Sequence, residues 1–452
     1  MKFVTIAMIL LFISSITAQD DTAAIMNEID SKKEAYAEIA HTIWTEAEMG
    51  YLEYKSSALL KETLEKEGFS ITSGVAEIPT AFVAEYGSGS PVIAILAEYD
   101  ALPGLSQQAV AEKKSAGKAA GHACGHHLFG TASSAAAIAA KNWLASNGNS
   151  GTVRLIGCPA EEGGGAKVYM VRAGVFDDVD VALHWHPSSQ NAASAGAALA
   201  NISAKFRFHG VSAHAAGAPH RGRSALDGVE AMNAMVNMMR EHIPERARIH
   251  YVITSGGKAP NVVPDYAEVY YYARHNRRDV VMGIFDRIAK AAEGAALGTG
   301  TSMDYEIING VHELLPNLTL QKKVHDNLTK VGGMTYTDKE LEFANKIAVS
   351  LGQDKASTEI AASIQPYKTE AKAYGSTDVG DVSFAVPTVG MGAATWVPGT
   401  SAHSWQAVAA GGTSIGLKGM IIAAKTLALT AVDLLKDPEL VKAAKSEFME
   451  RR

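Results

Sequence analysis

The length, composition and charge of the chain limit what kind of protein it can be. Its 452 residues suffice for two or three domains, and 47% hydrophobic against 20% charged residues exclude an intrinsically disordered chain. The net charge of −7 argues against a nucleic-acid partner, because such a partner requires a basic surface. We therefore expect a globular protein with a large buried core.

The first residues have the pattern of a secretory signal peptide. Lys2 precedes an apolar stretch, Phe3 to Ile13, and small and polar residues continue to Ala18. A buried first helix is the alternative, but the stretch is short for a membrane span and the residues after Ala18 are polar. We expect a signal peptide at 1–18 and an exported chain, periplasmic or secreted.

Short apolar runs predict a parallel sheet in the first half of the chain. The runs at 91–100, 152–162 and 178–187 each end in acids or histidines, and helix-like segments at 132–146 and 165–174 separate them. This alternation predicts an α/β fold in which helices flank a mainly parallel central sheet. Ligands bind outside the carboxyl ends of such strands, so the polar clusters are expected to meet at one edge.

The pattern changes after Ala200 and predicts a second domain. Strands are expected at 203–210, 247–257, 267–276 and 302–310, and helices at 224–242 and 279–298. This β-α-β-β-α-β order is that of a ferredoxin-like α+β sandwich. We predict a lid or dimerisation domain at 198–315, inserted into a discontinuous catalytic domain at 19–197 and 316–452.

Two further helices are predicted after the inserted domain. Thr337 and Glu340 form a capping box, which predicts a helix that begins at Thr337. Ile415 to Leu435 is strongly apolar but contains charged residues, so we expect a packed helix and no stable membrane insertion.

The run GHACGHH at 121–127 is the first candidate site. In a loop or an extended segment Cys124 and His126 point to the same side, and thiolate with imidazole suits Zn²⁺ or Mn²⁺. A Cys and a His packed at a helix start are the alternative.

Cys158 is the second of two cysteines, so a disulfide and site chemistry both remain open. A thiol redox protein is disfavoured because no Cys-x-x-Cys is present.

Glu161 and Glu162 form the second candidate site, directly before three glycines. Two adjacent carboxylates repel and could simply face solvent. At a strand end next to the Cys–His run, one could instead bind a metal while the other faces a metal-bound water.

Further histidines complete a possible ligand set. His184 and His186 have the same parity in a predicted strand, and His403 lies in a turn rich in Gly, Ser and Thr. Together with Cys124, His126 and Glu162, these residue types could hold two divalent ions that share a water. One glutamate would be left over as a general base.

The motifs of the chain resemble those of a known family. EYDALPG, GHACGHH, GCPAEEGGG, WHP, GVSAHAA, the PN of KAPNVVP, GSTDVGD and HSWQ occur in the order found in dinuclear metallopeptidases and amidohydrolases. That family includes hippurate and indole-acetyl-amino-acid hydrolases. The resemblance extends from about residue 30 to about residue 435 and is strongest to the aminobenzoyl-glutamate hydrolases.

The resemblance implies roles for individual residues. It implies that Cys124 bridges two metals, that His126, Glu162, His186 and His403 are the other ligands, that Glu161 is the general base, and that Asp100 orients a ligand. In the lid, it implies that His214 reaches the partner subunit's site and that Asn261 and Arg274 bind the substrate carboxylate, although Arg274 could also form a surface salt bridge. His127 and Glu98 depart from the family's pattern, and we expect Glu98 to orient a ligand.

The resemblance also implies an activity. We expect a metal-dependent amidohydrolase that uses two divalent ions per subunit, Mn²⁺ or Zn²⁺, to cleave the amide bond of N-acyl or N-aroyl amino acids such as aminobenzoyl-glutamate. A homodimer is expected. The alternatives are an exported dipeptidase or carboxypeptidase of the same family and a non-catalytic metal-binding partner subunit.

Overall fold

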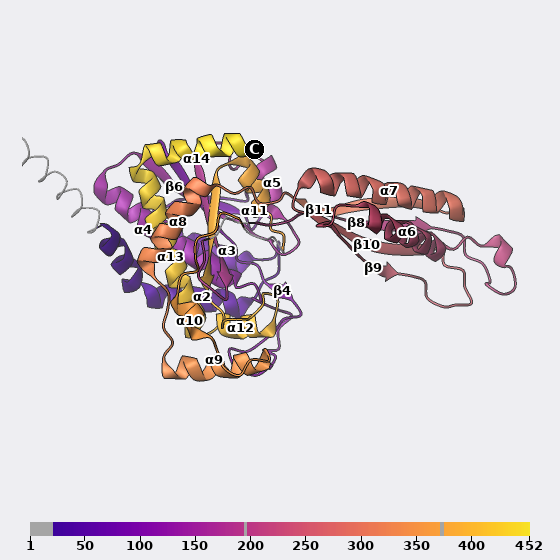
Figure 1. Ribbon diagram of the computed structural model, residues 1–452, viewed down its shortest axis with the longest axis horizontal. Coiled ribbons are helices and arrows are strands. Elements are labelled where there is room, and N and C mark those ends of the chain that lie inside the picture. The colour runs from indigo at the N-terminus through magenta and orange to yellow at the C-terminus, as the bar shows by residue number, and fades with distance from the viewer. Residues whose placement is uncertain (1–20, 194–196, 371–374) are drawn as a thin grey trace, which may run out of the picture. The chain divides into compact units, whose positions relative to one another are not determined.

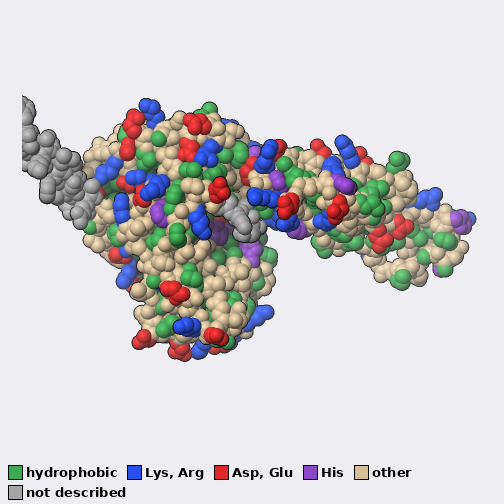
Figure 2. Space-filling model, viewed as in Figure 1, with side chains coloured by type: hydrophobic (Ala, Val, Ile, Leu, Met, Phe, Trp, Pro, Cys, Tyr) green, Lys and Arg blue, Asp and Glu red, His purple; other side chains and the backbone are tan. Residues whose placement is uncertain are grey.

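The computed structural model describes residues 21–193, 197–370 and 375–452 (Figure 1). The predicted signal peptide at 1–18 lies outside the described residues. The chain divides into two compact units, the first formed by Met1–Gly196, Leu315–Ala371 and Val382–Arg452 and the second by Ala197–Leu314 and Lys372–Asp381. On the face drawn in Figure 2, acidic and basic side chains are interspersed.

The first unit is built on a six-stranded, mainly parallel sheet. In spatial order its strands are β1 (Ser70–Ser73), β2 (Phe82–Ser88), β6 (Gly151–Gly157), β3 (Val92–Ala97), β7 (Val181–Ser188) and β12 (Thr388–Ala394). The pairs β6–β3, β3–β7 and β7–β12 are parallel, whereas β1–β2 and β2–β6 are antiparallel. A two-stranded ribbon of β4 (Leu102–Pro103) and β5 (Ala120–Gly121) accompanies the sheet.

Helices flank this sheet. They are α2 (Lys33–Glu46), α3 (Tyr54–Lys66), α4 (His126–Asn147), α5 (Ala166–Arg172), α8 (Leu318–Val331), α9 (Asp338–Ser350), α10 (Thr358–Ala362), α12 (Trp405–Gly411), α13 (Ser414–Lys436) and α14 (Pro438–Arg451), with a 3₁₀ turn η1 (Val75–Glu77). The chain passes from one unit to the other within α11 (Val379–Ala385).

Two long apolar helices form the centre of the first core. α4 and α13 pack against each other and against strands of the sheet. Because α4 is rich in alanine, its backbone can approach the sheet closely, and most of its residues are buried. α13 is long and apolar enough to cross a membrane, but 78% of its most apolar window is buried inside the protein. It is therefore a packed core helix, as expected.

The second unit is an antiparallel sheet with two helices. The strand order is β11 (Ser302–Val311), β8 (Ala200–His209), β10 (Tyr266–His275) and β9 (Arg248–Ser255). The helices α6 (Ala225–Met239) and α7 (Arg278–Thr299) pack against the sheet (Figure 1). Short 3₁₀ turns occur at η2 (Pro219–Arg221) and η3 (Arg240–His242). The chain order β8-α6-β9-β10-α7-β11 is the split pattern expected from the sequence.

The second unit contains one segment that the sequence analysis placed in the catalytic domain. The described part of Lys372–Asp381 joins it, although 316–452 was predicted to belong wholly to the catalytic domain. Hydrogen bonds explain this difference. The backbone N–H of Leu199 donates to the carbonyl of Gly375 (2.7 Å), and the N–H of His312 donates to the carboxylate of Asp381 (2.9 Å).

The start of α4 also differs from the prediction. The helix begins at His126 and not near residue 132, so His126 is its first residue. Gly125 turns the chain between Cys124 and the helix with a φ of +78°, and a Cβ atom there would lie 2.8 Å from the ring of Pro187. Cys124 and His126 are therefore arranged by a glycine turn and not by an extended segment. The capping box at Thr337 is present as predicted.

We predict that the aromatic core of the second unit is sensitive to truncation. Phe206 is fully buried, and its ring centroid lies 5.9 Å from that of Tyr271 and 5.3 Å from that of Tyr305. Phe206→Ala should lower the free energy of unfolding by about 3–5 kcal/mol, because it leaves a cavity. Leu297→Ala, at a side chain that is 86% exposed, is the control and should change it by less than about 0.5 kcal/mol. Equal urea midpoints for the two variants would contradict this packing.

Candidate metal centre

Neighbouring parallel strands bring the acidic and histidine side chains to one edge of the first unit's sheet. β6, β3 and β7 lie side by side. Glu98 and Asp100 follow β3, Glu161 and Glu162 follow β6, and His186 lies near the carboxyl end of β7. This is the edge at which the sequence predicted that the polar clusters would meet.

Asp100 determines which nitrogen of His126 is available to a metal. The Nδ1 atom of His126 lies 2.7 Å from a carboxylate oxygen of Asp100. A carboxylate can only accept, so Nδ1 carries a proton, and in the neutral ring Nε2 keeps its lone pair. Metal-binding histidines commonly donate their second nitrogen to a carboxylate in this way. The other oxygen of Asp100 accepts the backbone N–H of Glu162 (2.8 Å).

His186 is oriented by a backbone carbonyl. Its Nδ1 atom donates to the carbonyl of Pro187 (2.7 Å), which leaves the Nε2 lone pair facing the Cys124 sulfur at 3.3 Å. His184, two residues earlier on the same strand, has a buried Nε2 atom with no hydrogen-bond partner and belongs to none of the described metal-ligand groups. Although the two histidines are two residues apart on one strand, only His186 faces Cys124 and belongs to a metal-ligand group.

Glu162 and His403 form a second pair of donors. A carboxylate oxygen of Glu162 lies 3.2 Å from Nε2 of His403. His403 has a φ of +60°, and its backbone N–H donates to the carbonyl of Ala123 (2.9 Å), one residue before Cys124. The loop that contains His403 is therefore attached to the segment that contains Cys124.

The donor atoms form three groups whose members lie within 4.8 Å of one another. These groups are Cys124–His126–His186, Cys124–Glu162–His403 and Glu98–His126–Glu161. Donor pairs 3.2–3.3 Å apart have the separation of two ligands bonded to one ion at about 2.0–2.3 Å. Cys124 and His126 each belong to two groups, but a thiolate sulfur has several lone pairs and could bridge two ions, whereas Nε2 of a neutral imidazole has only one.

Three buried polar atoms without hydrogen-bond partners also indicate a metal site. One carboxylate oxygen of Glu98, Nε2 of His126 and one carboxylate oxygen of Glu162 are buried and make no hydrogen bond. Because buried polar atoms normally have partners, three such atoms within one cluster fit a cation that they would surround. The residues present therefore fit a metal site.

Glu98 lies among the donor atoms, whereas the sequence predicted only that it orients a ligand. One of its oxygens lies 3.2 Å from Nε2 of His126, and the other forms a 2.6 Å ion pair with Lys167. Both side chains of this ion pair are buried. Lys167 was not predicted as a site residue, and the only signal for it in the sequence is a lysine in the short helix after the Glu161–Glu162 turn.

The electrostatics of the cluster favour added positive charge. Burial raises the pKa of the Cys124 thiol, because it disfavours the thiolate. Burial also disfavours protonation of His126, but Asp100 and Cys124 outweigh this effect and raise the pKa of His126 well above its usual value. The anions around His126 thus stabilise a positive charge at the position where a metal ion would provide it.

The remaining residues of the Cys–His run have structural partners. His122 donates from Nε2 to the carbonyl of Ile43, and His127 donates from Nε2 to the carbonyl of Gly411, both at 3.0 Å. Burial, and then His126, lower the pKa of His122 to about 3, so it is neutral. Cys124 and Cys158 are both buried and are not joined by a disulfide, and the Cys158 thiol donates to the carbonyl of Ile156 (3.2 Å).

The predicted lid residues all belong to the second unit. The loop of His214 pairs with the loop of Asn261, since the N–H of Ala215 donates to the carbonyl of Asn261 (3.0 Å). Arg274 lies on β10, stacks over the ring of Tyr272 (5.1 Å) and donates to the Ser376 hydroxyl (3.1 Å). No ion pair of Arg274 is found among the described residues.

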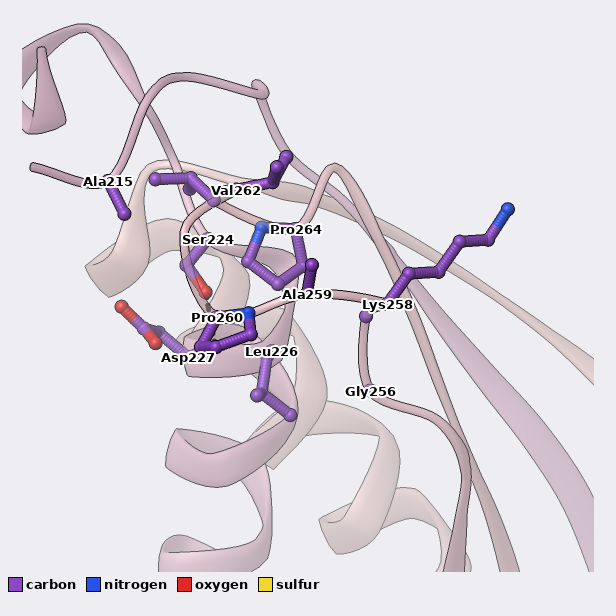
Figure 3. Close-up of a pocket in the computed structure, with 12 residues that line it drawn as sticks. Ala215, Ser224, Leu226, Asp227, Gly256, Lys258, Ala259, Pro260, Val262 and Pro264 are labelled. Carbon is purple, nitrogen blue, oxygen red and sulfur yellow. Dashed lines mark hydrogen bonds between the residues drawn. The ribbon is translucent and has the colours of Figure 1, made fainter. Parts of the chain in front are cut away.

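The second unit also has a surface cavity of about 540 Å³ (Figure 3). Leu226, Pro260 and Pro264 contribute apolar walls, and the side chain of Lys258 extends away from them in the figure. The cavity borders the loop that contains Asn261. None of its lining residues belongs to the donor groups of the metal centre.

Comparisons with known proteins agree with these observations. A family described as a peptidase dimerisation domain matches residues 199–299. The B subunit of the p-aminobenzoyl-glutamate hydrolase of Escherichia coli (strain K12) is 44% identical, and the match covers 94% of each chain. The Xaa-Arg dipeptidase of Mus musculus is 31% identical over 93% of this chain and 90% of that protein.

A solved structure supports the fold. The Bacillus subtilis YXEP protein, described as a dinuclear metal binding peptidase from the M20 family, superposes with a TM-score of 0.62 at 18% identity. The match covers 90% of this chain and 99% of that chain. The chain therefore belongs to the M20 family of metal-dependent peptidases and amidohydrolases, as its motifs predicted, and includes a dimerisation domain of that family.

Proposed function

We propose that this amidohydrolase cleaves the amide bond of N-aroyl amino acids and that p-aminobenzoyl-glutamate represents its substrate class. The observation that supports this most directly is the cluster of donor atoms, because it could hold metal ions and because Glu161, which shares a group with Glu98 and His126, supplies a further carboxylate. The 44% identity to one subunit of an aminobenzoyl-glutamate hydrolase supports the substrate class. The 31% identity to a dipeptidase makes short dipeptides the second candidate.

We propose two divalent ions, Mn²⁺ or Zn²⁺, as cofactors. Cys124, His126 and His186 would hold one ion, and Cys124, Glu162 and His403 the other. Soft thiolate and imidazole donors favour Zn²⁺, whereas the surrounding carboxylates are compatible with Mn²⁺. When bound, such ions supply Lewis-acid polarisation of a carbonyl and lower the pKa of a water.

Glu161 is the proposed general base. It accepts a proton from the attacking water and then passes that proton to the nitrogen of the leaving amine, so the amide C–N bond breaks and a carboxylic acid and an amine are released. Glu162, the adjacent residue, remains a ligand. Neighbouring residues in a turn project their side chains differently, so two adjacent carboxylates can have separate tasks.

His214 is suited to donate a hydrogen bond to the substrate carbonyl. Its Nδ1 atom accepts the backbone N–H groups of Ala216 (3.2 Å) and Gly217 (3.1 Å). In the neutral ring Nε2 must then carry the proton and can donate it to an oxygen on which negative charge develops. Arg274 and Asn261 are the proposed contacts of the substrate carboxylate, because a guanidinium can bind a carboxylate with two parallel hydrogen bonds.

We propose that the chain forms a homodimer through the second unit. β9 is an edge strand, and its Val252 and Ile253 side chains are exposed. Met235 and Met238 of α6 are also exposed, and α6 adjoins β9 through a hydrogen bond from Asn237 to Tyr251 (3.3 Å). An exposed edge strand beside apolar side chains is a surface that a second copy would cover. The family's dimerisation domain at 199–299 includes all of these residues.

We also propose that residues 1–18 direct export of the chain, since a lysine, an apolar stretch and small residues precede Gln19. Mass spectrometry of the protein expressed with this leader in a bacterial host should find Gln19 as the first residue. A mature chain that still begins at Met1 in the cytoplasm would contradict the proposal. Ala18→Arg, which disrupts the small residue before the cleavage point, should prevent processing.

We predict that Glu161→Gln abolishes turnover without removing the metals. Loss of a general base should lower kcat for p-aminobenzoyl-glutamate by about 10²–10⁴-fold. Metal analysis should find the wild-type metal content in Glu161→Gln and a reduced content in Glu162→Gln, because only Glu162 is a proposed ligand. A chelator should abolish wild-type activity, and added Mn²⁺ or Zn²⁺ should restore it. Near-wild-type kcat in Glu161→Gln would refute the assigned base.

We predict that charge on the exposed β9 edge separates the two copies. Val252→Lys together with Met238→Lys should give a monomer in light scattering, because lysines on an edge oppose strand pairing. Val349→Lys, at an exposed site on α9 of the first unit, is the matched control and should leave the wild-type mass unchanged. A double variant with the wild-type mass would exclude this surface as the interface.

A further inference from the structure

The turn that contains Glu161 and Glu162 has an unusual backbone. Ala160, directly before Glu161, is buried and has a φ of +52°. The turn closes on itself, because the N–H of Gly165 donates to the carbonyl of Ala160 (2.8 Å). A residue with a Cβ atom in this left-handed region costs roughly 1–2 kcal/mol, so other contacts must hold Ala160 in place.

Two buried carboxylates hold alternate backbone amides of this turn. One oxygen of Glu53 accepts the N–H of Ala160 (2.8 Å), and one oxygen of Asp100 accepts the N–H of Glu162 (2.8 Å). The second oxygen of Glu53 accepts the hydroxyl of Thr80 (3.0 Å). The backbone of Glu161 is therefore held on both sides by hydrogen bonds to buried carboxyl groups.

Glu53 is placed in a way that helix stability does not explain. It is the N-cap residue of α3, yet its side chain makes no capping hydrogen bond and turns to Ala160 instead. It is fully buried, and burial followed by the charge of Asp100 raises its pKa to about 7. Burying a carboxyl group is costly unless its hydrogen bonds are satisfied. Its contacts to Thr80 and Ala160 provide that satisfaction.

The segment around Glu53 also holds the other end of the turn. The hydroxyl of Tyr51 donates to the carbonyl of Gly164 (2.8 Å). Gly50 and Gly164 leave room for the methyl group of Ala160, since a Cβ atom at either glycine would lie within 3.0 Å of it. Residues 50–53 therefore contact both ends of the turn and match its shape.

We propose that Glu53 is a positioning residue of the metal centre, whose carboxyl group holds Ala160 in the left-handed conformation that directs Glu161 and Glu162 to their separate places. This inference rests on the proposed function of Glu161 and Glu162. Glu53 itself acts on the reaction only through the backbone of the turn.

The test uses variants of Glu53 and Ala160 in the full chain. Glu53→Leu removes the acceptor and should lower kcat for p-aminobenzoyl-glutamate by about 10²-fold with KM little changed, because a small displacement of a catalytic group is enough for such a loss. It should also weaken binding of the ion assigned to Glu162, measured by equilibrium dialysis. Glu53→Gln keeps an oxygen for the Ala160 amide and should restore most of kcat.

A second-site variant distinguishes positioning from general stability. Glycine adopts a positive φ without strain, so Ala160→Gly should recover part of the kcat lost in Glu53→Leu.

The control for general loss of stability is Glu340→Leu. Glu340 is a buried glutamate bonded to Thr337, Ser414 and Lys418, and its loss should lower the Tm but leave kcat unchanged while the protein is folded. If Glu53→Leu does not fold, Glu53→Asp is used instead. Its shorter side chain moves the carboxyl oxygen away from the Ala160 N–H but keeps the carboxyl group, and it should show the same loss of kcat.

The inference is overturned if folded Glu53→Leu or Glu53→Asp retains wild-type kcat and metal affinity. It is also overturned if Ala160→Gly recovers none of the loss. These results are distinct from failure of the proposed function, because that failure would appear as an active Glu161→Gln variant whatever Glu53 does.

Discussion

The arrangement of the candidate metal centre depends on one buried carboxylate, that of Asp100. One of its oxygens accepts from Nδ1 of His126 and the other from the backbone N–H of Glu162. Asp100 therefore orients a ligand on α4 and a turn after β6 at the same time. Burial opposes its ionisation, but His126 and the Glu162 amide outweigh this and keep the pKa of Asp100 below its usual value. Because a single charged group satisfies both partners, the two donor segments are oriented together.

The protein accepts unfavourable local features at this site. Ala160 and His403 have positive φ values without being glycines, and Glu98 and Lys167 form a fully buried ion pair. Each of these features costs free energy in isolation, and the large apolar core formed around α4 and α13 compensates for it. Local strain of this kind is common at functional sites, where the position of a side chain matters more than the stability of its segment.

Much of the fold followed from periodicity and capping signals. The strands β3, β6 and β7, the split order of the second unit and the start of α9 at the Thr337 capping box agree with the predictions. The start of α4 was missed, because the close approach of Gly125 to Pro187, a residue distant in the chain, is not visible in the local pattern. The part of residues 372–381 that joins the second unit was also missed, since hydrogen bonds to a distant strand determine its position.

The sequence by itself determined the family and predicted that acidic side chains and His186 lie at strand ends, because motifs and alternation are local properties of the chain. The alternation of the strand left His184 and His186 equivalent and only the family resemblance favoured His186, whereas the tertiary structure shows the physical reason, since His186 faces the sulfur of Cys124. The tertiary structure alone revealed that Glu53 lies beside the Glu161–Glu162 turn and that Lys167 forms an ion pair with Glu98. Residues far apart in the chain become neighbours through packing, and no local pattern encodes the hydrogen bonds that then form between them.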